Sequence, residues 1–291
     1  MTEKLCGIFA PITTPFNKDG SVNYEHLGAN VQRYAKTDLK GFLILGSNGE
    51  NKSLRQNEKE QVVKTIIAAK APGQVTMVGS IFESTTETVE FAKMAEQAGA
   101  DFITLLPPSY FKSQMKDSVL LKYFTDTASS VKTPCLLYKA PQFSGGVDLS
   151  LNLIKDCAGH PGIAGIKDSS SSGIEKILLS VPEGFAVLSG SANTFFTAML
   201  SGATGGVISM ADYMPEKITE LYTLIRSGKL KEAADLNNRI VKCNINVSGS
   251  WGVAGVKCAM DICGYHGGAP RLPLLPVPDE GVNALKRSLA I

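Results

Sequence analysis

The chain has 291 residues, of which 44% are hydrophobic and 19% are charged, so it is long enough for one large α/β domain or two small ones. Its 29 basic and 27 acidic residues give a formal net charge of +2 without a block of basic residues, which argues against nucleic-acid partners and against electrostatic binding to a membrane. No apolar stretch approaches the roughly 18 residues of a spanning helix, and the N-terminus opens directly into a strand-like segment, so we expect a cytoplasmic protein without a secretory signal.

Short apolar runs recur eight times along the chain, and each is followed by an amphipathic segment. Strands that are buried on both faces and alternate with helices indicate a parallel sheet. The predicted strands span residues 7–13, 41–45, 75–79, 102–106, 134–138, 163–167, 185–188 and 206–210.

Helix signals lie between these runs. The segment from Ser53 to Gln56 has the pattern of a capping box, and residues 83–98 carry a helical apolar stripe that ends near Gly99, a plausible C-cap. Residues 215–226, 230–247 and 253–263 also have helical patterns, and Trp251 falls in an irregular break between the last two.

Eight strand–helix units predict an α/β fold, a (β/α)8 TIM barrel with a C-terminal helical extension. We place the barrel in residues 1–225 and the extension in residues 226–291 of the same domain. A doubly wound sheet is the alternative, but the GxGxxG phosphate fingerprint that would follow its first strand is missing.

Cysteine and histidine are scattered, without the spacing of metal ligands. We therefore expect no metal, no disulfide framework and no histidine-dependent catalytic triad. Cys135 lies in an apolar strand and Cys258 in a helical pattern, which predicts buried thiols of a reducing compartment.

Active sites of such barrels form where strands end, and Lys167 lies at the end of the sixth run. Desolvation there would lower the pKa of the ammonium and leave part of it neutral, as Schiff-base chemistry with a carbonyl substrate requires. A lysine that extends to water is the other interpretation. Tyr138 ends the fifth run and is a candidate for proton transfer or for simple packing. The 46–49 turn after the second run has exposed amides that suit a carboxylate.

The sequence resembles the pyruvate-dependent class I aldolases related to dihydrodipicolinate synthase and N-acetylneuraminate lyase. The resemblance covers essentially the whole chain. It rests on four motifs in the right order: Thr13-Thr14-Pro15-Phe16, Gly46-Ser47-Asn48-Gly49-Glu50, Tyr138-x-x-Pro141 and Gly165-Ile166-Lys167-Asp168.

The resemblance implies a catalytic role for four residues. Lys167 would form the Schiff base with pyruvate or a longer 2-oxo acid, and Tyr138 would shuttle protons as the carbon–carbon bond forms or breaks. Ser47 would link Tyr138 to Tyr110, which in relatives reaches across a subunit interface. The family therefore implies a homo-oligomer, a dimer or a tetramer, and it requires no cofactor and no metal.

The resemblance also implies the residues that bind the substrate. The amides of Ser47 and Asn48 would hold its carboxylate, and Ser169, Gly190 and Ile208 match positions that line the pocket.

One departure from the family pattern bears on which substrate the chain would accept. Synthases of dihydrodipicolinate normally carry an arginine two residues after the Tyr-x-x-Pro turn, where this chain has Phe143, which offers no partner to a carboxylate. The sequence therefore favours an aldolase for 4-hydroxy-2-oxoglutarate or for 2-keto-3-deoxy sugar acids. Lys139 stands where relatives often have asparagine; it either meets a distal carboxylate or, as strand alternation favours, points away from the pocket. Glu50 is interpreted as a structural hydrogen-bond partner.

Other readings remain open beside this one. The chain could be a dihydrodipicolinate synthase that tolerates Phe143, or a relative without catalysis that binds a 2-oxo acid. A phosphate-binding barrel finds support only in the 189–191 segment. The aldehyde partner depends on pocket shape and stays unassigned.

Overall fold

The computed structural model describes residues 2–290, which form two compact units. The first comprises residues 2–6 and 75–206, and the second comprises residues 7–74 and 207–290. The order of the strands, β1 to β8, is that of a closed parallel barrel. The predicted (β/α)8 barrel with C-terminal helices is therefore confirmed.

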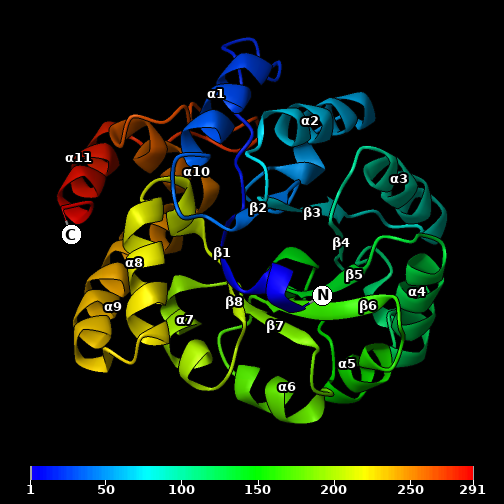
Figure 1. Ribbon diagram of the computed structural model, residues 1–291. Coiled ribbons are helices and arrows are strands. Elements are labelled where there is room, and N and C mark those ends of the chain that lie inside the picture. Colours follow the sequence, from blue (N-terminus) through cyan, green and yellow to red (C-terminus); the bar gives the residue numbers. More distant parts are fainter. Residues whose placement is uncertain (1, 291) are drawn as a thin grey trace. The chain divides into compact units, whose positions relative to one another are not determined.

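The first unit alternates strands with helices. Its elements are β3 (Val75–Ser80), α3 (Thr85–Gln97), β4 (Phe102–Leu105), α4 (Asp117–Ser129), β5 (Cys135–Lys139), α5 (Leu151–Ala158), β6 (Ile163–Asp168), α6 (Ile174–Ser180), β7 (Ala186–Ser189), α7 (Ala192–Leu200) and the start of β8 (Gly205–Val207). In Figure 1, helices α3 to α6 lie outside the strands of this unit. Every residue of β3, β4 and β7 is buried, which accounts for their nearly continuous apolar sequences.

The second unit contains the first two strands and the C-terminal helices. Its elements are β1 (Gly7–Ala10), α1 (Tyr24–Tyr34), β2 (Gly41–Ile44), α2 (Gln56–Ala69), α8 (Pro215–Arg226), α9 (Leu230–Asn244), α10 (Ser250–Ile262) and α11 (Asp279–Ser288). Strands β1 and β2 pair in parallel, with Phe9 opposite Gly41. Both strands are fully buried, so this unit also has an apolar interior.

All eight predicted strands are present, but two end three residues earlier than predicted. Strand β1 ends at Ala10 instead of residue 13, and β8 ends at Val207 instead of residue 210. Residues Ser209–Asp212 form a 3-10 helix, closed by the bond from the Ala211 N–H to the carbonyl of Ile208. The apolar sequence continues past the last hydrogen-bonded residue of each strand because the residues that follow are also buried. Apolar composition alone therefore does not mark where a strand ends.

The two helix caps expected from the sequence have different outcomes. The capping box predicted at Ser53 is wrong: Ser53 ends the 3-10 helix Asn51–Ser53, and α2 begins at Gln56 with Arg55 as its N-cap. The carboxylate of Glu58 accepts a hydrogen bond of 2.8 Å from the Arg55 N–H, so this reciprocal bond lies two residues further on. Helix α3 ends near Gly99 as predicted, but its C-cap residue is Ala98, and Gly99 follows the cap with φ of +92°.

Helices α8, α9 and α10 overlap the predicted ranges, and the backbone is irregular near Trp251. Helix α9 ends at Asn244 and continues as a π-helical turn, Ile245–Gly249, before α10 begins at Ser250. Within α10, Gly252 has φ of +55° and ψ of −140°, a backbone conformation that L-residues rarely adopt. The irregular break expected around Trp251 is therefore present.

The cysteines are free thiols with different degrees of burial. Cys135 is buried as predicted, and desolvation raises its pKa to about 12. Cys258 is only half-buried, which corrects the prediction of a buried thiol: it is not among the buried residues of α10, although its neighbours Lys257 and Ala259 are. Within residues 2–290, no helix combines the length and the apolar character that crossing a membrane requires.

Candidate active site

Lys167 and Tyr138 lie side by side at the ends of two neighbouring strands of the first unit. Strands β5 and β6 pair in parallel with Tyr138 opposite Lys167, and side chains at paired positions point to the same face. The exposed fraction is 5% for Lys167 and 1% for Tyr138, and the Lys167 Nζ lies 4.1 Å from the centre of the tyrosine ring. The ring face therefore stabilises and orients the amine, as in a cation–π contact.

The serine after β6 has a buried hydroxyl with no hydrogen-bond partner among residues 2–290. Its backbone is fixed, since the Ser169 N–H donates to the carbonyl of Lys139 at 2.8 Å. Gly190 follows β7, and its N–H donates to the carbonyl of Asp168 at 2.7 Å. A Cβ at Gly190 would lie only 1.9 Å from the Ser169 Oγ, so this position needs glycine for the serine to keep its place. A buried hydroxyl without a partner beside Lys167 is suited to a substrate oxygen.

Two acidic side chains border the Lys167 strand end. Asp168 is 2% exposed, and its Oδ1 accepts hydrogen bonds from the N–H (3.0 Å) and the hydroxyl (2.6 Å) of Ser170. Desolvation raises the pKa of Asp168, against the opposing effect of these bonds and of the Lys139 charge. Lys139 itself forms an ion pair with Asp148. The ammonium of Lys139 is therefore already paired with a carboxylate of the protein, that of Asp148.

Tyr110 and Phe143 lie on the surface of the first unit. Tyr110 is 80% exposed, its ring packs edge-on against Phe111, and its N–H donates to a carboxylate oxygen of Glu83 at 2.9 Å. Phe143 is 52% exposed at the end of the 3-10 helix Pro141–Phe143. The structure thus brings Lys167, Tyr138, Ser169 and Gly190 together, but it leaves Tyr110 outside that group.

The second unit contains the turn after β2 that carries Ser47 and Asn48. The Gly49 N–H donates to the carbonyl of Gly46, and the Glu50 N–H donates to that of Ser47, both at 3.1 Å. A Cβ at Gly49 would lie 3.1 Å from the carbonyl oxygen of Ile12, so a side chain there would crowd the segment that follows β1. The turn is therefore compact and closed by its own backbone.

The side chain of Asn48 is directed toward the 3-10 helix after β8. Its Nδ2 donates to the Ser209 Oγ at 3.0 Å and to the Asp212 Oδ2 at 3.3 Å, while the N–H of Asn48 has no partner among the described residues. That N–H is suited to an anionic ligand. Ile208 is fully buried, and its N–H donates to the carbonyl of Phe9 at 3.1 Å, so Ile208 is part of the core of its unit.

The prediction that Glu50 is a structural hydrogen-bond partner is confirmed. Its Oε1 accepts a bond from the Lys257 Nζ at 2.8 Å, and its Oε2 accepts one from the Arg271 N–H at 2.9 Å. Neither Lys257 nor Arg271 was found from the sequence. A signal for Lys257 was present, since a lysine within the apolar helical stretch 253–260 indicates a buried charge that needs a partner.

No group of three or more histidine, cysteine, aspartate or glutamate side chains that could hold a metal ion occurs in the part of the chain that the structure describes. The strand ends of the first unit offer an amine, a phenol and a hydroxyl, and the turn after β2 in the second unit offers backbone amides.

Comparisons with known proteins agree with this geometry. The model of the dihydrodipicolinate synthetase family matches residues 4–291. The chain is 28% identical to a probable mitochondrial 4-hydroxy-2-oxoglutarate aldolase of Emericella nidulans, covering 98% of this chain and 94% of that protein. It is 30% identical to a 4-hydroxy-tetrahydrodipicolinate synthase of Bartonella bacilliformis, covering 98% and 97%. Among solved structures, the prophage protein YagE of E. coli K12, in complex with pyruvate, is similar with a TM-score of 0.91, 27% identity and coverage of 97% and 96%.

Proposed function

The chain belongs to the dihydrodipicolinate synthetase family and is a lyase of that family, and on this premise we propose that it is a class I aldolase that acts through a Schiff base on Lys167. The observation that carries the proposal is the buried pair of Lys167 and Tyr138, with 4.1 Å between the amine and the ring centre. A nucleophilic amine next to a phenol is what imine formation followed by proton transfer needs.

The proposed reaction begins with pyruvate or a longer 2-oxo acid. The neutral amine of Lys167 attacks the keto carbon, and the carbinolamine loses the former keto oxygen as water to give a protonated imine. The imine accepts the electron pair of the C–H bond of the adjacent carbon as a base removes the proton, and the resulting enamine adds to the carbon of an aldehyde. Water then releases the product and restores the amine. Aldol cleavage follows the same steps in reverse.

Each remaining residue has one task in this proposal. Tyr138 transfers protons to and from the reacting oxygen atoms, and the partnerless hydroxyl of Ser169 binds a substrate oxygen. The amides of Ser47 and Asn48 hold the substrate carboxylate, and Ser47 belongs to the proton relay with Tyr138, as the family resemblance implies. Holding both ends of the substrate keeps the keto carbon at the amine.

We infer that the substrate is a 4-hydroxy-2-oxoglutarate or a 2-keto-3-deoxy sugar acid. Phe143 supports this inference, because it has no group that could pair with the carboxylate of aspartate semialdehyde. The similarity to the Emericella nidulans protein, a probable 4-hydroxy-2-oxoglutarate aldolase, also supports it. The second candidate is 4-hydroxy-tetrahydrodipicolinate synthase activity, which the similarity to the Bartonella bacilliformis enzyme favours.

A homo-oligomer in the cytoplasm is part of the same proposal. Tyr110, to which the family resemblance gives a role across a subunit interface, is 80% exposed in the single chain, which suits a residue that a second copy covers. Size-exclusion chromatography with light scattering would distinguish a dimer or tetramer from a monomer.

The experiment that tests the function is borohydride reduction in the presence of pyruvate, followed by mapping of the adduct by mass spectrometry. We expect a pyruvyl adduct on Lys167, its loss in Lys167→Arg, and its persistence in Lys176→Arg, which changes an exposed lysine of α6. An adduct on Lys167 with neither cleavage of a hydroxy-2-oxo acid nor condensation with aspartate semialdehyde would identify a binding protein without catalysis. A folded protein without the adduct would refute the Schiff-base mechanism.

The substrate is then identified by cleavage assays with 4-hydroxy-2-oxoglutarate and 2-keto-3-deoxy sugar acids, run beside condensation of pyruvate with aspartate semialdehyde. Pyruvate release from the first group supports the main proposal. Activity confined to the condensation supports the synthase.

A further inference from the structure

Lys257 and Glu50 form an ion pair that is completely withdrawn from water. The exposed fraction of the side chain is 0% for Lys257 and 1% for Glu50. The ammonium donates to Glu50 and to the carbonyl of Thr14, each at 2.8 Å, and lies 4.4 Å from the centre of the Phe16 ring. Burial lowers the pKa of Lys257, and the carboxylate of Glu50 counteracts this effect. Because desolvation offsets much of the attraction in such a pair, stability alone does not explain its presence.

The position of Glu50 suggests another reason. It is the residue that closes the 46–50 turn, through the bond from its N–H to the carbonyl of Ser47. Its backbone has φ of +52°, in the left-handed region that residues other than glycine seldom occupy. Such a conformation persists where the surroundings hold it in place. The bonds of the Glu50 carboxylate therefore fix the end of the turn that carries Ser47 and Asn48.

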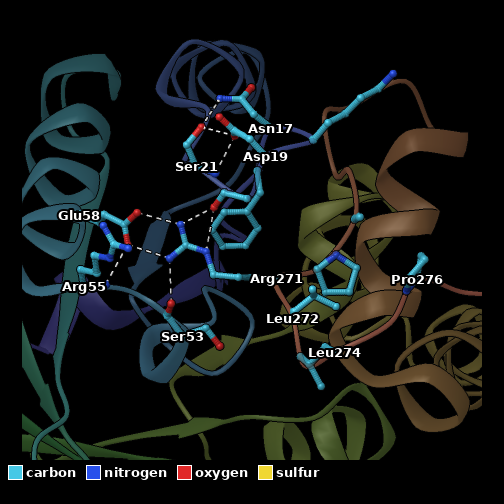
Figure 2. Close-up of a pocket in the computed structure, with 15 residues that line it drawn as sticks. Asn17, Asp19, Ser21, Ser53, Arg55, Glu58, Arg271, Leu272, Leu274 and Pro276 are labelled. Carbon is cyan, nitrogen blue, oxygen red and sulfur yellow. Dashed lines mark hydrogen bonds and ion pairs between the residues drawn. The ribbon is translucent and has the colours of Figure 1, made fainter.

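Arg271 is the second residue that binds the carboxylate of Glu50. While its N–H donates to Glu50, its guanidinium makes two hydrogen bonds to Glu58, of 2.7 and 2.8 Å. The same guanidinium bonds to the carbonyl of Ser53 at 2.8 Å and to that of Gly20 at 2.9 Å. Figure 2 shows Arg271 with Glu58 and Ser53 among the residues that line a pocket. The volume of this pocket is about 790 Å³. The N–H that meets Glu50 thus comes from an immobilised residue.

A further contact ties the same turn to the chain after β1. The hydroxyl of Thr14 donates to the carbonyl of Gly49 at 2.8 Å, and the carbonyl of Thr14 accepts from Lys257. The ammonium of Lys257 therefore holds two segments at once, the end of the turn through Glu50 and its neighbour through Thr14. Removing this one charge would release both.

We infer that Glu50 and Lys257 are positioning residues that aim the backbone amides of the Ser47–Asn48 turn at the substrate carboxylate. The inference rests on the proposed function, because it needs a 2-oxo acid held by those amides. Neither residue touches the substrate. The buried charge pair keeps the turn in the one conformation that presents its N–H groups to an anion.

The test compares pyruvate with acetone, in which a methyl group replaces the carboxylate. Borohydride trapping on Lys167 is measured against ketone concentration for the unmodified protein and for Lys257→Met. We expect the half-saturating pyruvate concentration to rise about tenfold, since small misplacements of an anchor have effects of at least this size. The yield with acetone should change less than about twofold, because acetone does not use the anchor.

The double variant Glu50→Gln/Lys257→Met provides the rescue. It leaves no unpaired charge, and the glutamine oxygen still accepts the N–H of Arg271, so we expect pyruvate trapping within about threefold of the unmodified protein. Lys242→Met, which removes an exposed charge from α9, is the matched control and should change nothing. If Lys257→Met does not fold, Glu50→Gln carries the same comparison.

Two results would overturn the inference: unchanged trapping of pyruvate in the folded variant, or an equal loss of pyruvate and acetone trapping. The absence of any pyruvyl adduct in the unmodified protein would instead refute the proposed function, so the two failures are distinguishable.

Discussion

Replacing Gly190 with alanine would insert a methyl group into space that Ser169 occupies. The new Cβ would lie 1.9 Å from the Ser169 Oγ, 2.9 Å from its Cβ and 3.0 Å from the carbonyl oxygen of Asp168. The backbones on both sides are bonded, Ser169 to Lys139 and Gly190 to Asp168, so a backbone shift breaks a hydrogen bond of 2.7 or 2.8 Å. The serine hydroxyl must therefore leave its position, or the two strand ends must separate.

The expected effects follow from these contacts. Overpacking of this kind costs about 1–3 kcal/mol of unfolding free energy. For a chain of this length, each kcal/mol lowers the melting temperature by about 2 °C. If the Ser169 hydroxyl bonds to the substrate, its displacement removes an interaction of about 1.5 kcal/mol. That loss raises the half-saturating pyruvate concentration about tenfold.

Thermal unfolding followed by circular dichroism measures the first effect, and borohydride trapping of pyruvate measures the second. Gly28→Ala in α1 is the control, since its methyl group would lie 4.0 Å from the nearest atom, on Thr65, and alanine favours the helix by up to about 1 kcal/mol. The two alanine substitutions should thus change stability in opposite directions. A Gly190→Ala protein with an unchanged melting temperature and unchanged pyruvate dependence would refute this account of Ser169.

Three further outcomes are expected. Tyr138→Phe should lower the turnover number by about 100-fold or more while the pyruvyl adduct still forms, because the role we propose for the phenol is proton transfer; an unaffected turnover number would exclude that role. Lys139→Ala should leave the Michaelis constants of diacid substrates within about twofold, since Lys139 is paired with Asp148, and a rise confined to diacids would show a contact with the substrate. The hydrogen bond from Arg271 lowers the pKa of Glu58 below its ordinary value of 4.5, so its stabilisation is present above that pH and is lost as the pH falls through the lowered pKa. Glu58→Gln should therefore flatten the pH dependence of the urea midpoint below pH 4.5, and a dependence identical to that of the unmodified protein would contradict this.

Local pattern determined the class of fold. Strands buried on both faces and helices with an apolar stripe are visible in a window of a few residues, so all eight strands could be predicted. The pairing of Tyr138 with Lys167 also follows from pattern, because each ends a parallel strand and neighbouring strands end at the same edge. The terminal residues of β1 and β8 did not follow, since hydrogen-bonded pairing stops before the apolar sequence does.

Tertiary structure decided which charges meet and where the glycines are needed. Glu50 and Lys257 are 207 residues apart in the chain, and no periodicity relates them. Gly190 is one glycine among 28, and only the position of the Ser169 hydroxyl shows that it has no room for a side chain. Secondary structure follows from short-range sterics and patterning, which can be read from a short stretch of sequence. A buried ion pair, or a position without room for a Cβ atom, depends instead on atoms that folding brings together from distant segments.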